Sequence, residues 1–396
     1  MKDKIAVVFS LILIFAFNAV DCSISPLVEP LHTHFGISTQ HVLLFISWGT
    51  IGILAGLILG PGLVKTYQPK NLIIAASSVM AVSLILFLLV HNFTAALWAR
   101  LIFGFCSGLI ASIMWWVAFY GVDRVYYQAM ISVLMSARAL STAFGVPFAG
   151  FSSKHAGLIF PFTVFAVLIL ISGAVLFFNL RKAETTSGGF NPASLLKDYW
   201  SALKLKYGFT FYLGFMTNRI CYFGIYSIAG IWFIKHYGLK TENIAAAFFY
   251  IGLGEALINF FVPKLISKFG YGFMFLSSIV MSGAALFSFI SGNLPVSAAI
   301  GAITLFVIMD RIYCMAVVIT IPDMFPESEN KTVFGTLNTL TAWTGLAIVS
   351  WFAGKYMDAI GITAFQSIIS SCFLLGAAIL IFVQWKTVLR KNTKVG

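Results

Sequence analysis

Residues 61–70 read PGLVKTYQPK, and residues 262–271 read VPKLISKFGY. Both segments are short and basic, and each follows a long apolar stretch of the chain. Leu63 of the first segment aligns with Leu265 of the second, and an aromatic residue aligns four positions further on. Recurrence of such a segment after about two hundred residues is typical of a membrane protein built from two duplicated halves.

The composition excludes an ordinary soluble domain. Of the 396 residues, 60% are hydrophobic and only 10% are charged, whereas soluble domains carry about 25% charged residues. A bilayer core needs about 20 helical residues to cross it, and a helix satisfies its backbone hydrogen bonds internally. The apolar stretches therefore predict an all-α membrane protein with twelve transmembrane helices. The predicted spans are 5–27, 42–63, 71–91, 94–119, 128–152, 158–180, 208–234, 243–263, 273–292, 296–320, 332–353 and 363–385.

One long polar stretch divides these spans into six and six. We expect an N-terminal six-helix bundle over 1–180, a cytoplasmic linker over 181–207 and a C-terminal six-helix bundle over 208–396. Of the 25 Lys and Arg residues, 17 lie on the side of the N-terminus and four in the opposite loops. This bias predicts a multi-pass protein of the cytoplasmic (inner) membrane with both termini in the cytoplasm. The net charge of +12 is explained by this topology and does not indicate nucleic-acid binding.

Other short motifs accompany the repeated segment. Residues 100–108 read RLIFGFCSG, and residues 145–150 read GVPFAG. On these motifs and on segment 61–70, the chain resembles the major facilitator superfamily along essentially its whole length. The family's loop after the second span has the form Gly-x-Leu-x-Asp-Arg-x-Gly, and here Lys65 stands in the place of Asp. The 145–150 element is similar to one found in exporters of the family.

The resemblance implies that the segment after span two, with its second copy, gates the cytoplasmic side by latching the two halves. Because the acidic residue of that latch is replaced here, different gating contacts are an open alternative. The candidate gating residues are Leu63, Lys65, Lys70, Lys268 and Gly270.

The small residues and the potential metal ligands of the chain indicate helix packing and not a metal-binding site. Gly52, Gly56 and Gly60 recur at every fourth position, a spacing that lets helices approach closely. The six histidines fall in loops or span ends, and the five cysteines fall inside spans without ligand spacing. We therefore expect no metal site and no cofactor.

Seven ionisable side chains lie well inside predicted spans, where a charge costs about 2.5–3.5 kcal/mol on insertion scales. Such side chains normally face the interior of the bundle and have a partner. Four are basic and three are acidic, so one positive charge can remain for an anionic substrate. The seven residues are Asp21, Arg100, Arg138, Arg219, Glu255, Asp310 and Arg311.

Asp21, which follows Asn18 within one turn, is the preferred candidate for proton coupling. A carboxylate in a cavity that opens to alternate sides can take up and release a proton; a static pair with Arg100 or Arg138 is the alternative. The family resemblance implies a role for Arg100 in proton coupling or in the substrate cavity. The remaining proton-coupling candidates are Glu255 and Asp310. The substrate-binding candidates are Asn18, Arg138, Asn218, Arg219, Tyr222, Tyr226 and Arg311.

Two of these candidates are adjacent in sequence. Asp310 and Arg311 point about 100° apart on a helix and cannot both face the same partner. For Glu255, a bridge to a neighbouring helix is the alternative to a proton site. Tyr222 and Tyr226 share one helical face near Arg219.

The sequence contains no recognisable nucleophile–base pair, phosphate-binding loop or ATP-binding domain. We therefore expect neither an enzyme nor a primary pump. The pattern predicts a monomeric secondary transporter in the lipid bilayer that moves a small organic solute, an anion being one class, by proton-coupled alternating access. A proton-driven exporter of drugs or metabolites, a lipid flippase and a non-transporting receptor on the same fold are the alternatives.

Overall fold

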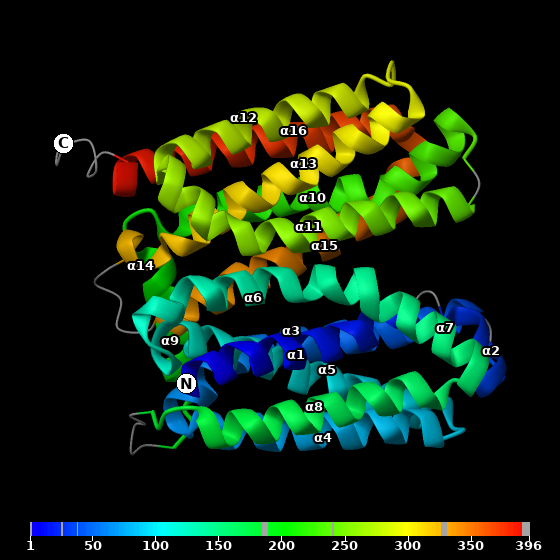
Figure 1. Cartoon of the computed structure of the whole chain (residues 1–396), viewed down its shortest axis with the longest axis vertical. Helices are drawn as coiled ribbons and strands as arrows, with labels where there is room; N and C mark the ends of the chain where they lie inside the picture. The colour runs from blue at the N-terminus through cyan, green and yellow to red at the C-terminus, as the bar shows by residue number, and fades with distance from the viewer. Residues whose placement is uncertain are drawn as a thin grey trace. The chain divides into compact units, whose positions relative to one another are not determined.

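The computed structural model describes residues 2–24, 27–37, 39–183, 189–239, 241–325 and 331–389, and these residues are almost entirely helical (Figure 1). The helices of the first half are α1 (Lys2–Ser23), α2 (Val28–Phe35), α3 (Thr39–Thr66), α4 (Pro69–Leu89), α5 (Phe93–Trp116), η1 (Val117–Gly121), η2 (Arg124–Tyr126), α6 (Tyr127–Leu140), η3 (Ser141–Gly145), α7 (Val146–Ala156) and α8 (Ile159–Asn179). They are followed by α9 (Pro192–Lys204), α10 (Gly208–Tyr237), α11 (Thr241–Phe269), α12 (Tyr271–Ile290), α13 (Val296–Ile319), α14 (Ile321–Met324), α15 (Lys331–Ile360), α16 (Ile362–Gln384) and η4 (Trp385–Leu389).

A long helix or a continuous helical run lies at each predicted span. Eleven stretches of the described residues are long and apolar enough to cross a membrane. The 30-residue helix α10 lies at the place of the predicted seventh span. The predicted all-α fold with twelve transmembrane helices is therefore confirmed.

The repeated segments form helix ends more than loops. Only Tyr67 and Gln68 separate α3 from α4, and only Gly270 separates α11 from α12. Helices α3 and α11 thus continue three and six residues beyond the predicted ends of the second and eighth spans, because a helix can leave the apolar layer with its backbone hydrogen bonds intact. Gly270 has a φ of 82°, a conformation that glycine adopts without the steric cost of a Cβ atom. Three short helices, α2, α9 and α14, lie outside the predicted spans.

Helices α3 and α5 pack in close contact along the predicted glycine seam. A Cβ atom at Gly52 would overlap with the carbonyl oxygen of Leu101, and one at Gly56 would overlap with the carbonyl oxygen of Phe105. Gly60, one turn further, lies against a side chain of α5. The expected packing role of this glycine row is therefore confirmed, since the two backbones touch where a side chain would separate them.

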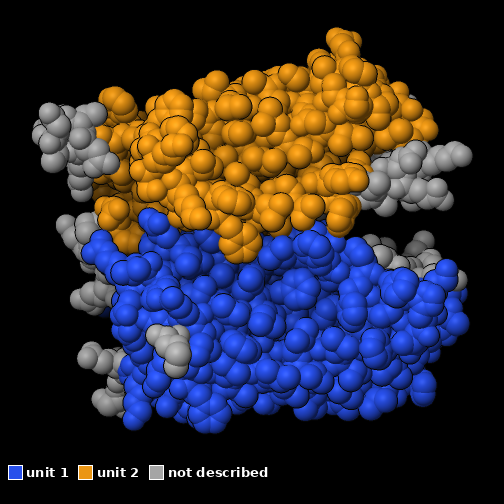
Figure 2. All heavy atoms as spheres, viewed as in Figure 1, with its two compact units in different colours: residues 1–198, 331–336 blue, residues 199–330, 337–396 orange. Residues whose placement is uncertain are grey.

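The chain divides into two compact units, which Figure 2 shows in different colours. Unit 1 comprises residues 1–198 and 331–336, and unit 2 comprises residues 199–330 and 337–396. The first turns of α15 thus belong to unit 1, where the hydroxyl groups of Ser112 and Thr336 lie 3.0 Å apart. The boundaries expected for the two bundles and the linker stay a prediction.

Helix pairing within unit 1 is repeated within unit 2. In unit 1, α3 and α4 pack on α5, and α8 packs on α1 and α4 (Figure 1). The counterparts six spans later make the same pairs in unit 2, where α11 and α12 pack on α13, and α16 packs on α10 and α12. This recurrence agrees with the duplication inferred from the repeated segments.

We expect Gly56→Ala to destabilise the protein by about 1–3 kcal/mol, because the added methyl group meets the backbone of α5 and the helices must separate. Thermal unfolding of the detergent-purified protein measures this change. The matched control is Gly301→Ala in α13, where a Cβ atom would meet nothing within 4 Å. An equal effect of the two substitutions on the unfolding temperature would contradict the role of the seam.

Candidate transport site

In unit 1, Arg100 of α5 forms an ion pair with Asp21 of α1, with 2.6 Å between Nη2 and Oδ1. The side chain of Arg100 is 1% exposed and that of Asp21 is 15% exposed. Oδ2 of Asp21 and Nε and Nη1 of Arg100 are also buried, and they have no hydrogen-bond partner among the described residues. The pair therefore retains one acceptor oxygen and two donor nitrogens for a further bond.

The position of the Arg100 guanidinium depends on a glycine in the neighbouring helix. A Cβ atom at Gly49 of α3 would lie 2.9 Å from Nη2 of Arg100. The rings of Phe87 and Phe103 have their centroids 5.8 Å and 5.0 Å from Cζ of Arg100, within the range of cation–π attraction. Helices α3, α4 and α5 together therefore hold this cation in the interior of unit 1.

Two other candidates of unit 1 lie near this pair on α1 and α6. Asn18 donates its side-chain amide to the carbonyl oxygen of Ile14 in its own helix, at 2.9 Å. Arg138 of α6 is half-buried, and the hydroxyl group of Thr142, one turn later, lies 3.7 Å from the sulfur of Cys22, the residue that follows Asp21. The structure thus places Arg138 beside α1 at the level of the proposed proton site.

In unit 2, Asp310 of α13 is completely buried and accepts hydrogen bonds from two residues of α10. Its Oδ2 lies 2.7 Å from Nη2 of Arg219, and its Oδ1 accepts from the amide of Asn218 at 3.0 Å. Arg219 also donates through Nε to the amide oxygen of Asn218 at 2.9 Å. Both carboxylate oxygens are therefore engaged, and the charge of Arg219 is balanced within the same network.

A second ion pair lies beside this network. Nε of Arg311 is 2.9 Å from Oε1 of Glu255 in α11. The ring of Tyr222 has its centroid 4.1 Å from Cζ of Arg311 and 4.8 Å from Cζ of Arg219. Asp310 and Arg311 thus have different partners, as their angular separation requires. Glu255 bridges α11 to α13.

The structure therefore brings the candidates together in two separate clusters. The cluster in unit 1 is the pair of Asp21 with Arg100. The cluster in unit 2 consists of Asn218, Arg219, Tyr222, Glu255, Asp310 and Arg311. Of the other candidates, Asn18 and Arg138 lie near the first cluster, and the side chain of Tyr226 lies outside the described residues.

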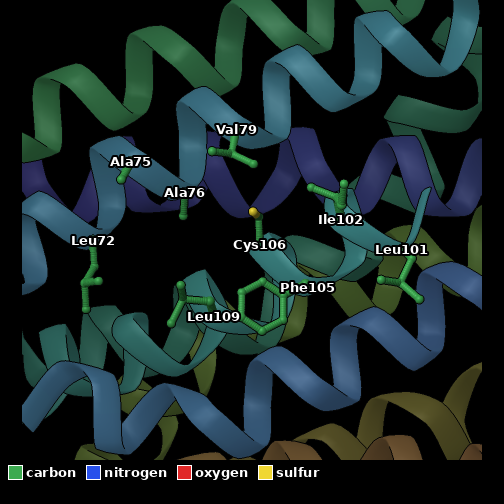
Figure 3. Close-up of a pocket in the computed structure, with 9 residues that line it drawn as sticks. All are labelled: Leu72, Ala75, Ala76, Val79, Leu101, Ile102, Phe105, Cys106 and Leu109. Atoms are coloured by element: carbon green, nitrogen blue, oxygen red, sulfur yellow. The ribbon is translucent and has the colours of Figure 1, made fainter. Parts of the chain in front are cut away.

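A cavity of about 310 Å³ lies between α4 and α5 in unit 1 (Figure 3). Its lining is apolar and includes Leu72, Val79, Ile102 and Phe105. None of the charged candidates lines this cavity. It can accept an apolar group but offers no counter-charge to an ionised solute.

The sequence matches the family model of the Major Facilitator Superfamily over residues 7–349. The chain belongs to the Major Facilitator Superfamily. No curated protein sequence matches it. Among solved structures, it is similar to the human organic anion transporter MFSD10 (TETRAN), with a TM-score of 0.74 and 16% identity over 96% of this chain and 99% of that chain. It is also similar to the proton:xylose symporter XylE bound to 6-bromo-6-deoxy-D-glucose, with a TM-score of 0.72 and 13% identity over 97% and 95% of the two chains.

Membership of the superfamily makes the chain a multi-pass membrane transporter and not an enzyme. The family and fold expected from the sequence are therefore confirmed. At these low identities the two solved structures support the fold alone, and the cargo named in each title belongs to that protein.

The superfamily's loop motif makes an ion pair of its own in this member. Lys65, at the place of the family's Asp, lies 3.3 Å from Oδ2 of Asp198 in α9. Gln68, three residues later, also binds the linker. Its side-chain amide donates to the carbonyl oxygen of Ala183 at 2.8 Å and accepts from the backbone N–H of Ala183 at 3.0 Å. Within unit 1, this motif therefore binds the polypeptide that links the two predicted bundles.

The other gating candidates make local contacts. The ammonium groups of Lys70 and Lys268 lie 5.4 Å and 5.2 Å from the centroid of an aromatic ring. Leu63 is half-buried in the last turns of α3, and Gly270 forms the positive-φ turn before α12. The gating role of these residues stays a prediction.

The exporter-like element of the superfamily bends the fifth span against α1. Because Pro147 has no N–H to donate to the carbonyl of Ala143, the helix adopts a π-helical turn, η3, just before it. A Cβ atom at Gly145 would lie 2.5 Å from the Cβ of Ala19. The bend thus touches α1 two residues before Asp21.

Arg181 has two acidic partners that are not among the residues singled out from the sequence. It donates to Asp123 at 2.7 Å and to Asp3 at 3.1 Å. The hydrogen bond from Arg181 holds the pKa of Asp123 below its ordinary value, and the same bond raises the pKa of Arg181. These ion pairs could have been suspected from the rarity of acidic residues, 13 against 25 Lys and Arg residues. An acid among basic loops has many possible partners.

We expect Lys65→Asp, placed opposite Asp198, to loosen the linker, and we expect the double variant Lys65→Asp/Asp198→Lys to restore its attachment. The pair is partly exposed, so the coupling is about 0.2–1 kcal/mol. The rate of limited proteolysis between residues 181 and 207 measures attachment. A double variant that is cleaved faster than either single variant would show that this ion pair does not hold the linker.

Proposed function

We propose that this superfamily member is a proton-coupled transporter of a small organic solute, and that Asp21 is the residue that binds and releases the proton. The observation that supports this choice is the incomplete bonding of the buried Asp21–Arg100 pair. Protonation of Asp21 at its unpartnered oxygen removes the negative charge that strengthens its single hydrogen bond with Arg100 at Oδ1. Protonation of Asp310 would disturb bonds to both Arg219 and Asn218.

Protonation of Asp21 makes the side chain of Arg100 available to the solute. When Asp21 is neutral, the guanidinium loses its counter-charge, and its buried Nε and Nη1 are already without a partner among the described residues. A carboxylate, or a hydroxyl group of a sugar, can accept hydrogen bonds from such a group. Binding of the solute and binding of the proton are therefore linked through one arginine side chain.

The network in unit 2 supports a different role. Its two arginines are each balanced by an acid and lie against the same Tyr222 ring. A neutral network of this kind stabilises the packing of α10, α11 and α13. We assign solute contact in unit 2 to Arg311, whose side chain is 11% exposed, and a structural role to Asp310.

We further propose that the protein works as a monomer by alternating access in the cytoplasmic (inner) membrane. The 17 basic residues on the side of the N-terminus, against four in the opposite loops, support cytoplasmic termini.

A lipid flippase is the second candidate function. The apolar cavity between α4 and α5 supports it, because its lining suits an acyl chain. The apolar lining favours the solute transporter, because it offers no polar group to the headgroup that a flippase must also carry.

The test is a proteoliposome assay with an imposed proton gradient and a panel of organic anions and sugars. We expect at least one solute to be accumulated in response to the gradient. Asp21→Asn is expected to lower gradient-driven accumulation at least tenfold while equal exchange of solute across the membrane persists, because the proton site is lost and Arg100 remains.

The matched control is Asp123→Asn, which neutralises an exposed acid of unit 1 outside the spans. It is expected to leave accumulation unchanged. If Asp21→Asn accumulates solute like the unaltered protein, the proton is carried elsewhere. If fluorescent phospholipid is translocated and no solute of the panel moves, the flippase is the correct function.

A further inference from the structure

The first turns of helix α9, up to Asp198, belong to unit 1 and pack on it by one face. Leu195 is 4% exposed, and a Cβ atom at Gly62 would lie 3.3 Å from its side chain. Three residues later, Asp198 forms the ion pair with Lys65 in the last turn of α3. Asn191 caps the start of the helix by accepting from the backbone N–H of Ala193 at 3.0 Å. These contacts fix which side of α9 faces the protein.

The opposite side of α9 exposes large apolar residues between lysines. Leu196 is 67% exposed and Trp200 is 60% exposed, and their spacing of four residues places them on one face. Lys204 continues the same row, with its ammonium 5.2 Å from the centroid of the Trp200 ring, and Lys197 is exposed beside it. Since α9 is one continuous helix, these side chains form a single surface, which we call the outward face.

The outward face lies close to the level at which the transmembrane helices end. Residues 205–207 alone join α9 to α10, and a segment of this length spans at most about 14 Å. The turn is tight, because the N–H of Gly208 donates to the carbonyl of Leu205 at 2.7 Å and Tyr207 has a φ of 72°. Lys65, which binds the other part of α9, belongs to the last turn of α3. Helix α9 therefore lies near the headgroup layer of the bilayer.

We infer that the outward face of α9 binds the headgroup layer of anionic phospholipids on the side of the basic loops. Tryptophan is enriched at this depth because its ring is apolar and its N–H is polar. An amphipathic helix with apolar residues flanked by lysines lies in the plane of the interface. Lys197 and Lys204 supply charges that attract anionic lipids, each by about fivefold in local enrichment. The ion pair of Lys65 with Asp198 orients the helix for this contact.

The experiment places a fluorescent label on Leu196→Cys or on Ser201→Cys in the full-length protein. Ser201 is an exposed residue on the same helix, about 100° around the helix axis from Trp200, and it serves as the matched control. Each variant is reconstituted with brominated phosphatidylglycerol or brominated phosphatidylcholine, both of which quench on contact. Unaltered protein, with its five native cysteines, gives the background of labelling.

We expect the label at position 196 to be quenched more than the label at position 201, and more by the anionic lipid than by the zwitterionic one. Lys197→Gln with Lys204→Gln should reduce this preference for the anionic lipid by at least about fivefold. Equal and weak quenching at the two positions would overturn the inference and leave the outward face to a protein partner. Strong quenching without any preference for the anionic lipid would overturn the assigned lipid class.

Discussion

An ionised side chain inside a bilayer is costly unless an opposite charge lies beside it, and this constraint determines the interior of the protein. Three acids within the spans each lie beside an arginine, at 2.6 Å, 2.7 Å and 2.9 Å. Each pair joins two different helices, so neutrality adds a link between α1 and α5, between α10 and α13, and between α11 and α13.

The three pairs differ in how completely they are bonded, and on this difference we base the proposed division between a stabilising pair and a transporting pair. Asp310 engages both of its oxygens, and its network joins α10 to α13. Asp21 engages one oxygen, and Arg100 keeps two buried nitrogens without a partner among the described residues. A fully bonded pair resists change, whereas an incompletely bonded pair can exchange its partner for a proton or a solute at lower cost. Steric room matters equally, since Gly49 leaves the space that the guanidinium of Arg100 occupies.

A second consequence concerns the connection between the two predicted bundles. In this chain a lysine stands at the acidic place of the superfamily's loop, and its partner is an acid of the linker helix α9. The basic residue Lys65 at this acidic position of the loop is therefore matched by an acidic partner, Asp198. The glycines of the α3–α5 seam and the linker contacts lie in the same unit, so close helix packing and linker attachment are properties of one compact unit.

The sequence by itself determined the spans, the duplication and the seven charges, because hydropathy, repeat spacing and the cost of buried charge are local properties of the chain. It also required different partners for Asp310 and Arg311, since helical geometry separates adjacent side chains. Only the tertiary structure decided that Arg100 pairs with Asp21, that Asp310 is fully bonded, and that Asp198 meets Lys65 across 133 positions of sequence. Such choices among several partners of equal charge depend on which helices lie side by side. That is decided by glycine seams and side-chain packing over the whole unit, which no single stretch of sequence contains.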